Sequence, residues 1–334
     1  MLMMRAVALC CASLVWLSAV ADIQAGQPEP QKVWVQDTQA IMGTRIHVEL
    51  QAADQAQGRR WTDLVMTEMH RIDHVFSPYK KSSELSRLNR LAGQRWVTVS
   101  DEMMAMLERA ARVSAMTEGA FDITYASIGR YYDYRQGKAP DSKLVRDKLA
   151  AIDYRHVELD RQSKRVRYQN AHVYVDLGGI AKGYAVDRAI TLLQEAGVTQ
   201  ASVAAGGDSR IIGNRDGQPW NVGVKHPRRQ DRMSVLLPLV DTAVSTSGDY
   251  ERYFETDGVR YHHILDPATG RSAADAWSVT ILGPEAMLTD GLSTSVFVLG
   301  PERGLALINR LPGIDAIIID RHGKLLYSDD LDGL

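Results

Sequence analysis

Apolar and polar residues alternate in several short stretches of the 334-residue chain, which is the pattern of strands buried on one face. Residues 33–50 are predicted to form two strands that break near Met42-Gly43-Thr44. Residues 155–175 alternate like a hairpin. The remaining predicted strands are 201–205, 220–225, 233–240, 259–265, 277–282, 315–319 and 324–327.

Other stretches repeat apolar residues at the three- and four-residue spacing that is typical of helices. The predicted helices are 59–76, 101–117, 141–151, 184–196 and 302–310. Strand pairs and helices are interspersed without a regular strand–helix–strand rhythm. We therefore expect an α+β fold with largely antiparallel sheets and flanking helices.

The first 21 residues differ in composition from the rest of the chain. Arg5 is their only charge, and the apolar run that follows ends in Ala19-Val20-Ala21. This pattern is typical of a secretory signal peptide, and the run is shorter than the roughly 20 apolar residues that a membrane span needs. We expect a signal peptide at 1–21, a linker at 22–33 and one domain at 34–334, which two subdomains could make up.

Cysteine content and net charge narrow the function classes. The two cysteines, Cys10 and Cys11, lie in the predicted signal peptide, so the mature chain would hold no disulfide, cysteine nucleophile or cysteine-bound zinc. Leu9 stands where a lipoprotein signal has a small residue, so we expect no lipid anchor. The net charge is −2, or −3 once Arg5 is removed, which argues against nucleic acid as a partner.

The densest glycine cluster, at residues 175–183, follows a predicted strand and opens a helix. Gly178 and Gly179 would let a ligand approach the backbone, and the N–H groups of a helix start favour an anion. Lys182 adds a positive charge suited to a phosphate. The spacing matches neither a P-loop nor a GxGxxG fingerprint. On spacing alone, a tight turn beside a surface lysine is an equally good interpretation.

A second candidate cluster contains a carboxylate and a hydroxyl four residues apart. Asp290 and Thr294 would share one face of a helix. Both offer oxygen atoms, which Mg²⁺ prefers as ligands. The alternative interpretation is that Asp290 is only the N-cap of that helix.

Two consecutive histidines precede the turn sequence Asp-Pro-x-x-Gly at residues 266–270. Alternation places His262 and His263 on opposite faces of a strand, so at most one of them should enter a site. A histidine there is a candidate base or phosphate donor. A structural or surface role is the alternative for each.

Four further clusters are weaker signals. Residues 76–79 place an aromatic ring on a loop, 119–124 combine backbone amides with a carboxylate, 205–208 form a glycine turn, and 245–250 are rich in hydroxyls. Each is also ordinary turn or packing chemistry. A Ser-His-Asp order or a G-x-S-x-G elbow is missing, so a hydrolase triad is not supported.

In this order, the clusters resemble the ApbE family, the FAD:protein FMN transferases, over roughly residues 34–330. The segments that carry the resemblance are MGT at 42–44, SPYKKSSELSRLN at 77–89, GAFDIT at 119–124, VDLGGIAKGYAVD at 175–187, AGGD at 205–208, VGVKHP at 222–227, STSGDYERYF at 245–254, HILDPATG at 263–270 and DGLST at 290–294. Each segment is short, but their collinear order makes the match specific.

The resemblance implies an enzyme that binds FAD with Mg²⁺ and moves FMN onto a threonine or serine hydroxyl of a target protein, releasing AMP. The implied contacts with FAD are Met42, Tyr79, Ala120, Phe121, Asp122, Asp176, Lys182 and the backbone of Leu265. The implied metal ligands are the Gly179 carbonyl, Asp290 and Thr294. Ser293 stands where some members have a second aspartate, which leaves the number of metal ions open.

The resemblance also suggests a base and a setting for the reaction. His263 matches a histidine near the FAD pyrophosphate and is our candidate general base, although water or Asp290 could take the proton instead. The family's targets are externally facing flavoprotein subunits of membrane redox complexes, such as the Na⁺-translocating NADH:quinone reductase and its Rnf relatives. A soluble periplasmic enzyme is therefore expected. The rival interpretations are an FAD pyrophosphatase that produces FMN and AMP, and an exported flavin-binding protein without catalysis.

Overall fold

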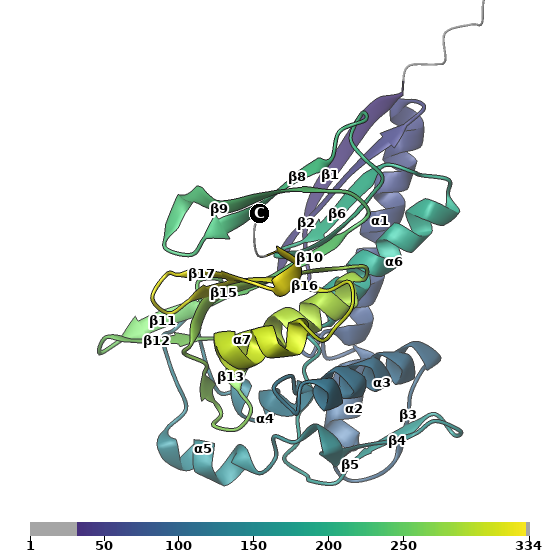
Figure 1. The fold of residues 1–334 in the computed structure, drawn as a ribbon. Coiled ribbons are helices and arrows are strands. Elements are labelled where there is room, and N and C mark those ends of the chain that lie inside the picture. Colours follow the sequence, from purple (N-terminus) through teal and green to yellow (C-terminus); the bar gives the residue numbers. More distant parts are fainter. Residues whose placement is uncertain (1–31, 332–334) are drawn as a thin grey trace, which may run out of the picture. The chain divides into compact units, whose positions relative to one another are not determined.

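Residues 32–331 are described by a computed structural model, shown in Figure 1. The predicted signal peptide, both cysteines and nearly all of the predicted linker lie outside the described residues. Within the described range, no helix combines the length and the apolar character needed to cross a membrane.

An antiparallel sheet of eight strands forms the centre of the fold (Figure 1). Its strands, in spatial order, are β1 (Val33–Ile41), β2 (Thr44–Ala52), β6 (Ala201–Ala205), β7 (Asp208–Ile212), β10 (Ala243–Gly248), β15 (Ala276–Gly283), β16 (Asp315–Asp320) and β17 (Leu325–Tyr327). Every neighbouring pair is antiparallel. The predicted α+β fold with antiparallel sheets and flanking helices is thus confirmed.

The hydrophobic pattern does not predict the central strands β7 and β10, because polar side chains occupy their core-facing positions. Ser245 on β10 is fully buried, and its hydroxyl lies 2.8 Å from that of Thr289. Asp208, the first residue of β7, is 2 % exposed. A strand that buries hydroxyls and a carboxylate lacks the apolar alternation on which the prediction relies.

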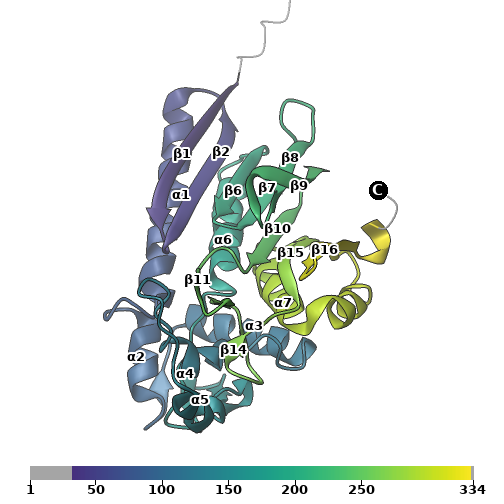
Figure 2. The same ribbon diagram turned by 90° about the vertical axis from the view of Figure 1, so that its left-hand side faces the viewer.

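Three long helices lie side by side against this sheet (Figure 2). Helix α1 (Gln55–Phe76) packs on β1 and β2, and α6 (Ala181–Glu195) packs on β6 and β7. Helix α7 (Ala286–Ile308) packs on β10 and β15. Because α6 contacts both α1 and α7, the start of α6 is held between its neighbours.

The helix predicted at 302–310 is only the second half of α7. The helix begins at Ala286 and bends at Gly300, whose φ of 77° lies outside the helical range, directly before Pro301. Its first half is buried on nearly every side, so it lacks the polar face that identifies a surface helix in a sequence. This first half carries Asp290 and Thr294.

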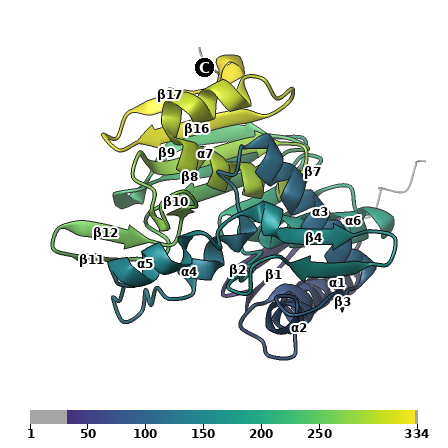
Figure 3. The same cartoon turned by 90° about the horizontal axis from the view of Figure 1, so that it is seen from below.

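The segment between α1 and α6 forms a smaller group of elements. It contains α2 (Glu84–Leu91), α3 (Asp101–Met116), η1 (Ile123–Tyr125), α4 (Ala126–Gly129), α5 (Ser142–Leu149), η2 (Tyr154–His156) and a sheet of β3 (Val97–Thr98), β5 (Arg165–Tyr168) and β4 (Val157–Asp160). Helix α2 contacts α1 and helix α3 contacts α7, as Figure 3 shows from below.

The hairpin predicted at 155–175 is confirmed only as far as Tyr168, where β5 ends. Beyond it no strand continues, and two backbone N–H groups donate to side chains. The N–H of Tyr174 donates to Ser127 Oγ at 3.0 Å, and that of Val175 donates to Asn89 Oδ1 at 2.9 Å. These hydrogen bonds fix the backbone that leads into the glycine cluster.

Three strand pairs and a short helix complete the described chain. They are β8 (Trp220–His226) with β9 (Arg229–Leu239), β11 (Tyr253–Thr256) with β12 (Val259–His262), β13 (Leu265–Asp266) with β14 (Arg271–Ser272), and η3 (Asp329–Leu331). The strand predicted at 259–265 is therefore interrupted at His263 and Ile264.

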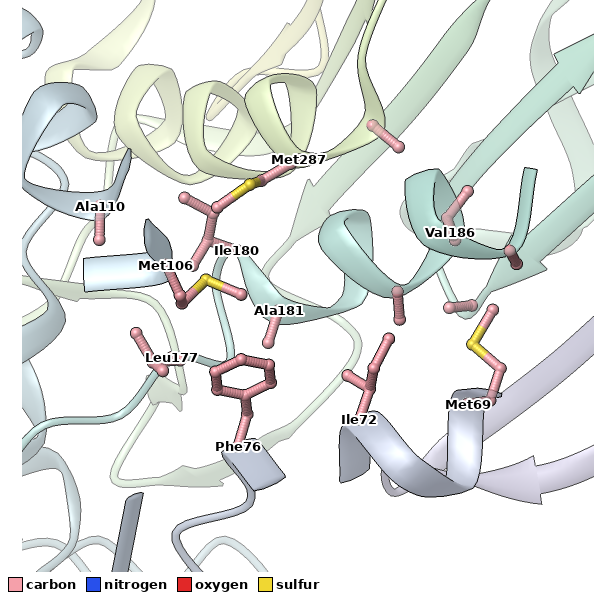
Figure 4. Packing of buried hydrophobic residues seen from close by; sticks show 14 of the residues in the cluster. Met69, Ile72, Phe76, Met106, Ala110, Leu177, Ile180, Ala181, Val186 and Met287 are labelled. Atoms are coloured by element: carbon pink, nitrogen blue, oxygen red, sulfur yellow. The ribbon is translucent and has the colours of Figure 1, made fainter. Parts of the chain in front are cut away.

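The main hydrophobic core lies where α1, α3, α6 and α7 meet (Figure 4). Phe76, Met106, Ile180 and Met287 come from these four elements or their ends, and each is at most 3 % exposed. A fully buried side chain of this size contributes about 1.5–3 kcal/mol. This packing fixes the start of α6 and, with it, the glycine cluster.

Candidate functional site

The close approach of α6 and α7 depends on Gly183. A Cβ added at this position would lie 2.1 Å from the backbone oxygen of Ala286, so only glycine fits between the helices. The Gly183 N–H donates to Asp290 Oδ2 at 3.0 Å. The neighbouring Lys182 consequently faces the first turns of α7.

Lys182, Asp208 and Asp290 form a buried ionic group, which we call the lysine cluster. The Lys182 ammonium lies 2.5 Å from Asp208 Oδ2 and 3.2 Å from both carboxylate oxygens of Asp290. Both carboxylates are 2 % exposed. Two buried acids therefore share one base, which leaves one negative charge in excess.

The electrostatics of the lysine cluster reflect this excess. Burial raises the pKa of Asp290 to about 7, and the neighbouring charge of Asp208 adds to the effect. Burial opposes the charge of Lys182, but the two carboxylates outweigh it and raise the pKa of the ammonium above its usual value. A divalent cation or a second positive group would relieve the repulsion between the acids.

Gly179 and Thr294 meet beside the lysine cluster. A Cβ on Gly179 would lie 3.5 Å from Thr294 Oγ1 and 3.2 Å from Cε2 of Phe121. The Thr294 hydroxyl lies 3.3 Å from Ser247 Oγ, which in turn lies 2.8 Å from Ser293 Oγ. Several hydroxyl oxygens thus gather beside Gly179, and hard cations prefer oxygen ligands.

Asp290 is not the N-cap of its helix. It lies inside α7, and its carboxylate bonds to Lys182 and Gly183 on α6. The cap is supplied from α6 instead, because Asp187 accepts from the N–H groups of Ala286 at 3.0 Å and Met287 at 2.8 Å. The alternative interpretation of Asp290 as a cap is therefore wrong.

The two histidines have different surroundings. His262 is buried, its Nε2 lies 2.7 Å from the oxygen of Ala273, and its ring packs edge-on against Phe297. His263 is half-buried, and its Nδ1 has no hydrogen-bond partner among residues 32–331. Burial lowers the pKa of His263 to about 3, and the positive charge of Arg252 acts in the same direction. Its imidazole is therefore neutral at physiological pH, with the buried Nδ1 unpaired within the described residues.

The turn between β1 and β2 has an unusual backbone. Met42 has a φ of 55° and Gly43 a φ of 70°, so both central residues are left-handed, as in a type I′ turn. A left-handed methionine is uncommon, and such strain is concentrated at functional sites. Tyr79, on the loop after α1, is 80 % exposed although hydrogen bonds anchor the backbone directly before it, at Ser77 and Pro78. The Tyr79 side chain is open to a planar ligand, whereas Met42 is half-buried and packs partly against the hydrophobic core.

A groove of about 620 Å³ lies at this turn. It is lined by Thr38, Gln39, Ala40, Ile41, Met42, Gly43, Thr44, Arg45, His70, Asp73 and Lys80. The lining contains Met42 but none of the residues of the lysine cluster.

Proteins of one family resemble this chain in both sequence and structure. The ApbE family profile matches residues 42–318. The chain belongs to the ApbE family. An FAD:protein FMN transferase of Vibrio cholerae is 34% identical over 311 residues, covering 89% of this chain and 92% of that protein. The enzyme of the same name from Treponema pallidum is 35% identical over 273 residues, covering 76% of this chain and 75% of that protein.

Solved ApbE structures share the fold. The ApbE protein of Thermotoga maritima superposes with a TM-score of 0.81 at 35% identity, covering 90% of this chain and 98% of that one. The flavin transferase ApbE of Vibrio cholerae superposes with a TM-score of 0.80 at 30% identity, covering 90% and 98%. The ApbE resemblance found in the sequence motifs is thereby confirmed.

Ala120, Phe121 and Asp122, which are expected to contact FAD, lie on the loop between α3 and η1. Phe121 is buried against Gly179, and Ala120 precedes it at a half-exposed position. The Asp122 carboxylate accepts from the N–H groups of Thr124 and Tyr154, each at 2.7 Å, so it is engaged within its own loop.

Asp176 and Leu265 complete the set. Burial raises the pKa of Asp176, whose Oδ1 accepts from the Gly178 N–H at 2.7 Å. The Leu265 side chain is 4 % exposed, so only its backbone is suited to a ligand.

Two acids that organise the site are not predicted as site residues by the sequence. The local pattern places Asp208 in a glycine turn that is only a weak candidate for approaching the same ligand, and it indicates no role for Asp187. Asp208 lies in the AGGD segment and Asp187 ends the VDLGGIAKGYAVD segment, so both stand within the motifs that carry the ApbE resemblance. Membership of these motifs is the signal by which they could be found.

Proposed function

We propose that this protein is an Mg²⁺-dependent FAD:protein FMN transferase that moves FMN onto a threonine or serine hydroxyl of a target protein and releases AMP. The observation that carries the proposal is the lysine cluster beside Gly179 and Thr294, in a chain of the ApbE family. The relatives named FAD:protein FMN transferase support the reaction class.

The residues present fit a magnesium ion. Two buried carboxylates against one ammonium leave an uncompensated negative charge when both are ionised, and the hydroxyl of Ser247 lies within hydrogen-bonding distance of those of Ser293 and Thr294. No group of three or more His, Cys, Asp or Glu side chains within residues 32–331 is arranged for a metal, so any ion would rely on mixed oxygen donors and water. Asp290, Thr294 and the Gly179 carbonyl would hold it. When bound, Mg²⁺ would supply electrostatic neutralisation of the pyrophosphate.

His263 would accept the proton of the attacking hydroxyl. The oxygen of the target residue forms a bond to the FMN phosphorus, while the bond from that phosphorus to the AMP oxygen breaks and AMP leaves with the electron pair. The proton passes to the imidazole, which is neutral before the reaction. A dianionic pyrophosphate beside His263 would raise its pKa again and make it a stronger base.

The expected setting is outside the cytoplasmic membrane. We propose that the protein is exported to the periplasm, is soluble there and is not lipid-anchored, since Arg5, the apolar run and Ala19-Val20-Ala21 support a cleaved signal peptide. The proposed targets are externally facing flavoprotein subunits of Na⁺-translocating NADH:quinone reductase or Rnf-type complexes.

The test mixes the protein beginning at Asp22 with FAD, Mg²⁺ and a candidate acceptor subunit. Intact-mass analysis should show the acceptor heavier by one FMN phosphoester, and EDTA should abolish the change. FMN and AMP formed equally fast without acceptor would show a pyrophosphatase instead. Binding of FAD without either product would show a flavin-binding protein.

A further inference from the structure

Arg252 spans two parts of the site that are far apart in the sequence. It directly precedes β11, and its Nη2 lies 3.3 Å from the place where a Gly43 Cβ would stand. Its backbone oxygen accepts from the His263 N–H at 3.1 Å. The guanidinium therefore reaches from the histidine loop to the β1–β2 turn.

The Arg252 side chain makes no ion pair or hydrogen bond within residues 32–331, in contrast to the arginines around it. Arg228 forms a two-pronged bond to Asp249, at 2.7 and 2.6 Å, and Arg260 lies 3.4 Å from the same carboxylate. Both carboxylate oxygens of Asp249 are thus occupied by bonds from Arg228 and Arg260. Arg252 is an exposed cation at the edge of the site with its donors available.

The charge of Arg252 reaches the groups that line the site. After the effect of burial, it is the next cause of the low pKa of His263. It also acts on the Asp176 carboxyl and on the phenol of Tyr79. These three residues come from different loops, and each lies close enough to Arg252 for its charge to act on them.

The charge balance of the site calls for such a cation. When both of its acids are ionised, the lysine cluster is one negative charge in excess, and the pyrophosphate of FAD carries two more. A single divalent ion offsets only two of these three charges. A guanidinium binds phosphate oxygens through two parallel hydrogen bonds, which gives it both charge and fixed geometry.

We propose that Arg252 binds the pyrophosphate of the dinucleotide substrate and stabilises the negative charge that AMP gains as its phosphorus–oxygen bond breaks. This assignment rests on the proposed function. It makes Arg252 a catalytic residue through direct contact with the substrate, separate from the lysine cluster.

Binding measurements in EDTA test the assignment without requiring turnover. Quenching of flavin fluorescence is titrated with FAD, FMN and riboflavin for the unmodified protein, Arg252→Gln and Arg252→Lys. The matched control is Arg60→Gln, which replaces an exposed arginine on α1. We expect Arg252→Gln to weaken FAD binding roughly 10- to 100-fold and to change riboflavin binding less than twofold. Arg252→Lys should restore part of the loss.

The salt dependence gives a second readout. Affinity for FAD should fall with ionic strength more steeply in the unmodified protein than in Arg252→Gln, because one charge contact is missing in the variant. Unchanged FAD affinity in Arg252→Gln would overturn the assignment. An equal loss for riboflavin would also overturn it, because the contact would then lie on the flavin ring or in the fold of the loop. The assignment fails as well if the unmodified protein binds FAD no better than riboflavin in EDTA.

The outcomes separate this inference from the proposed function. A selective loss of FAD affinity in Arg252→Gln, combined with no FMN transfer to any acceptor by the unmodified protein, would uphold the contact and reject the transferase. FMN transfer at the normal rate by Arg252→Gln would uphold the transferase and reject the contact between Arg252 and the pyrophosphate.

Discussion

The Lys182 ammonium lies at the same distance, 3.2 Å, from both carboxylate oxygens of Asp290, and so joins the first turn of α6 to α7. This contact ties the N-terminal end of one helix to the proposed metal ligand on the other. It also buries a carboxylate in a position where its charge is costly without a cation.

Replacing Asp290 with asparagine should separate stability from function. Because burial raises the pKa of Asp290 to about 7, the ionised form is disfavoured in the folded state, and at pH 8 without metal it destabilises the fold. Asp290→Asn should therefore show an unchanged or higher Tm in EDTA, while FMN transfer falls at least about 100-fold. Thermal unfolding and intact-mass kinetics measure the two effects. A large drop in Tm would instead show that the carboxylate is a structural element.

His263→Ala should lose turnover and keep FAD. A general base typically contributes about 10²–10⁴-fold, so the transfer rate should fall within that range. FAD affinity should stay within about threefold, since the neutral imidazole adds no charge to the site. Single-turnover mass spectrometry and fluorescence titration measure the two quantities. Transfer at the normal rate would reject His263 as the base. His262→Ala serves as the comparison. It should mainly lower Tm, because the His262 ring is buried against Phe297.

Gly183→Ala should push α6 and α7 apart. The added Cβ would meet the Ala286 backbone oxygen at 2.1 Å, and a backbone atom cannot turn aside as a side chain can. We expect a loss of about 1–3 kcal/mol in the free energy of unfolding and a weaker response to Mg²⁺. The control is Gly291→Ala on α7, where the nearest atom is Val113 Cγ1 at 3.2 Å and can move. Urea unfolding should show a near-neutral effect there.

The sequence can predict the elements whose apolar residues repeat regularly, and it cannot predict those held by buried polar contacts. Helix α1 and the strands β1 and β2 follow from their patterns. Strand β10 and the first half of α7 do not, because Ser245 and Thr289 satisfy each other inside the core.

The same distinction, between local sequence patterns and contacts made only in the folded chain, applies to the site. Motif order is sufficient to bring Gly179, Lys182, Asp290 and Thr294 into one group. The cap that Asp187 places on Ala286 joins residues 99 positions apart, and no local pattern reports such a contact. The reach of Arg252 to Gly43 is likewise a property of the folded chain alone.

Acid should weaken the fold through the arginine that joins α1 to α3. Arg71 Nε lies 2.8 Å from Glu68 Oε2, and its Nη2 lies 2.7 Å from Glu102 Oε1. Hydrogen bonds from Arg71 are the largest cause that lowers the pKa of both glutamates. A carboxyl whose pKa is lower in the folded state stabilises the fold above its unfolded pKa, so this contribution is lost as pH falls below about 4.5.

The contribution should amount to about 1 kcal/mol, because solvent screens the partly exposed guanidinium. Urea unfolding at pH 7 and pH 4 measures it, with Arg71→Gln as the comparison. The variant should be less stable at pH 7 and should lose less stability on acidification. If both proteins lose the same free energy between the two pH values, the glutamates titrate independently of Arg71, and the acid sensitivity of the fold must originate in other carboxyl groups.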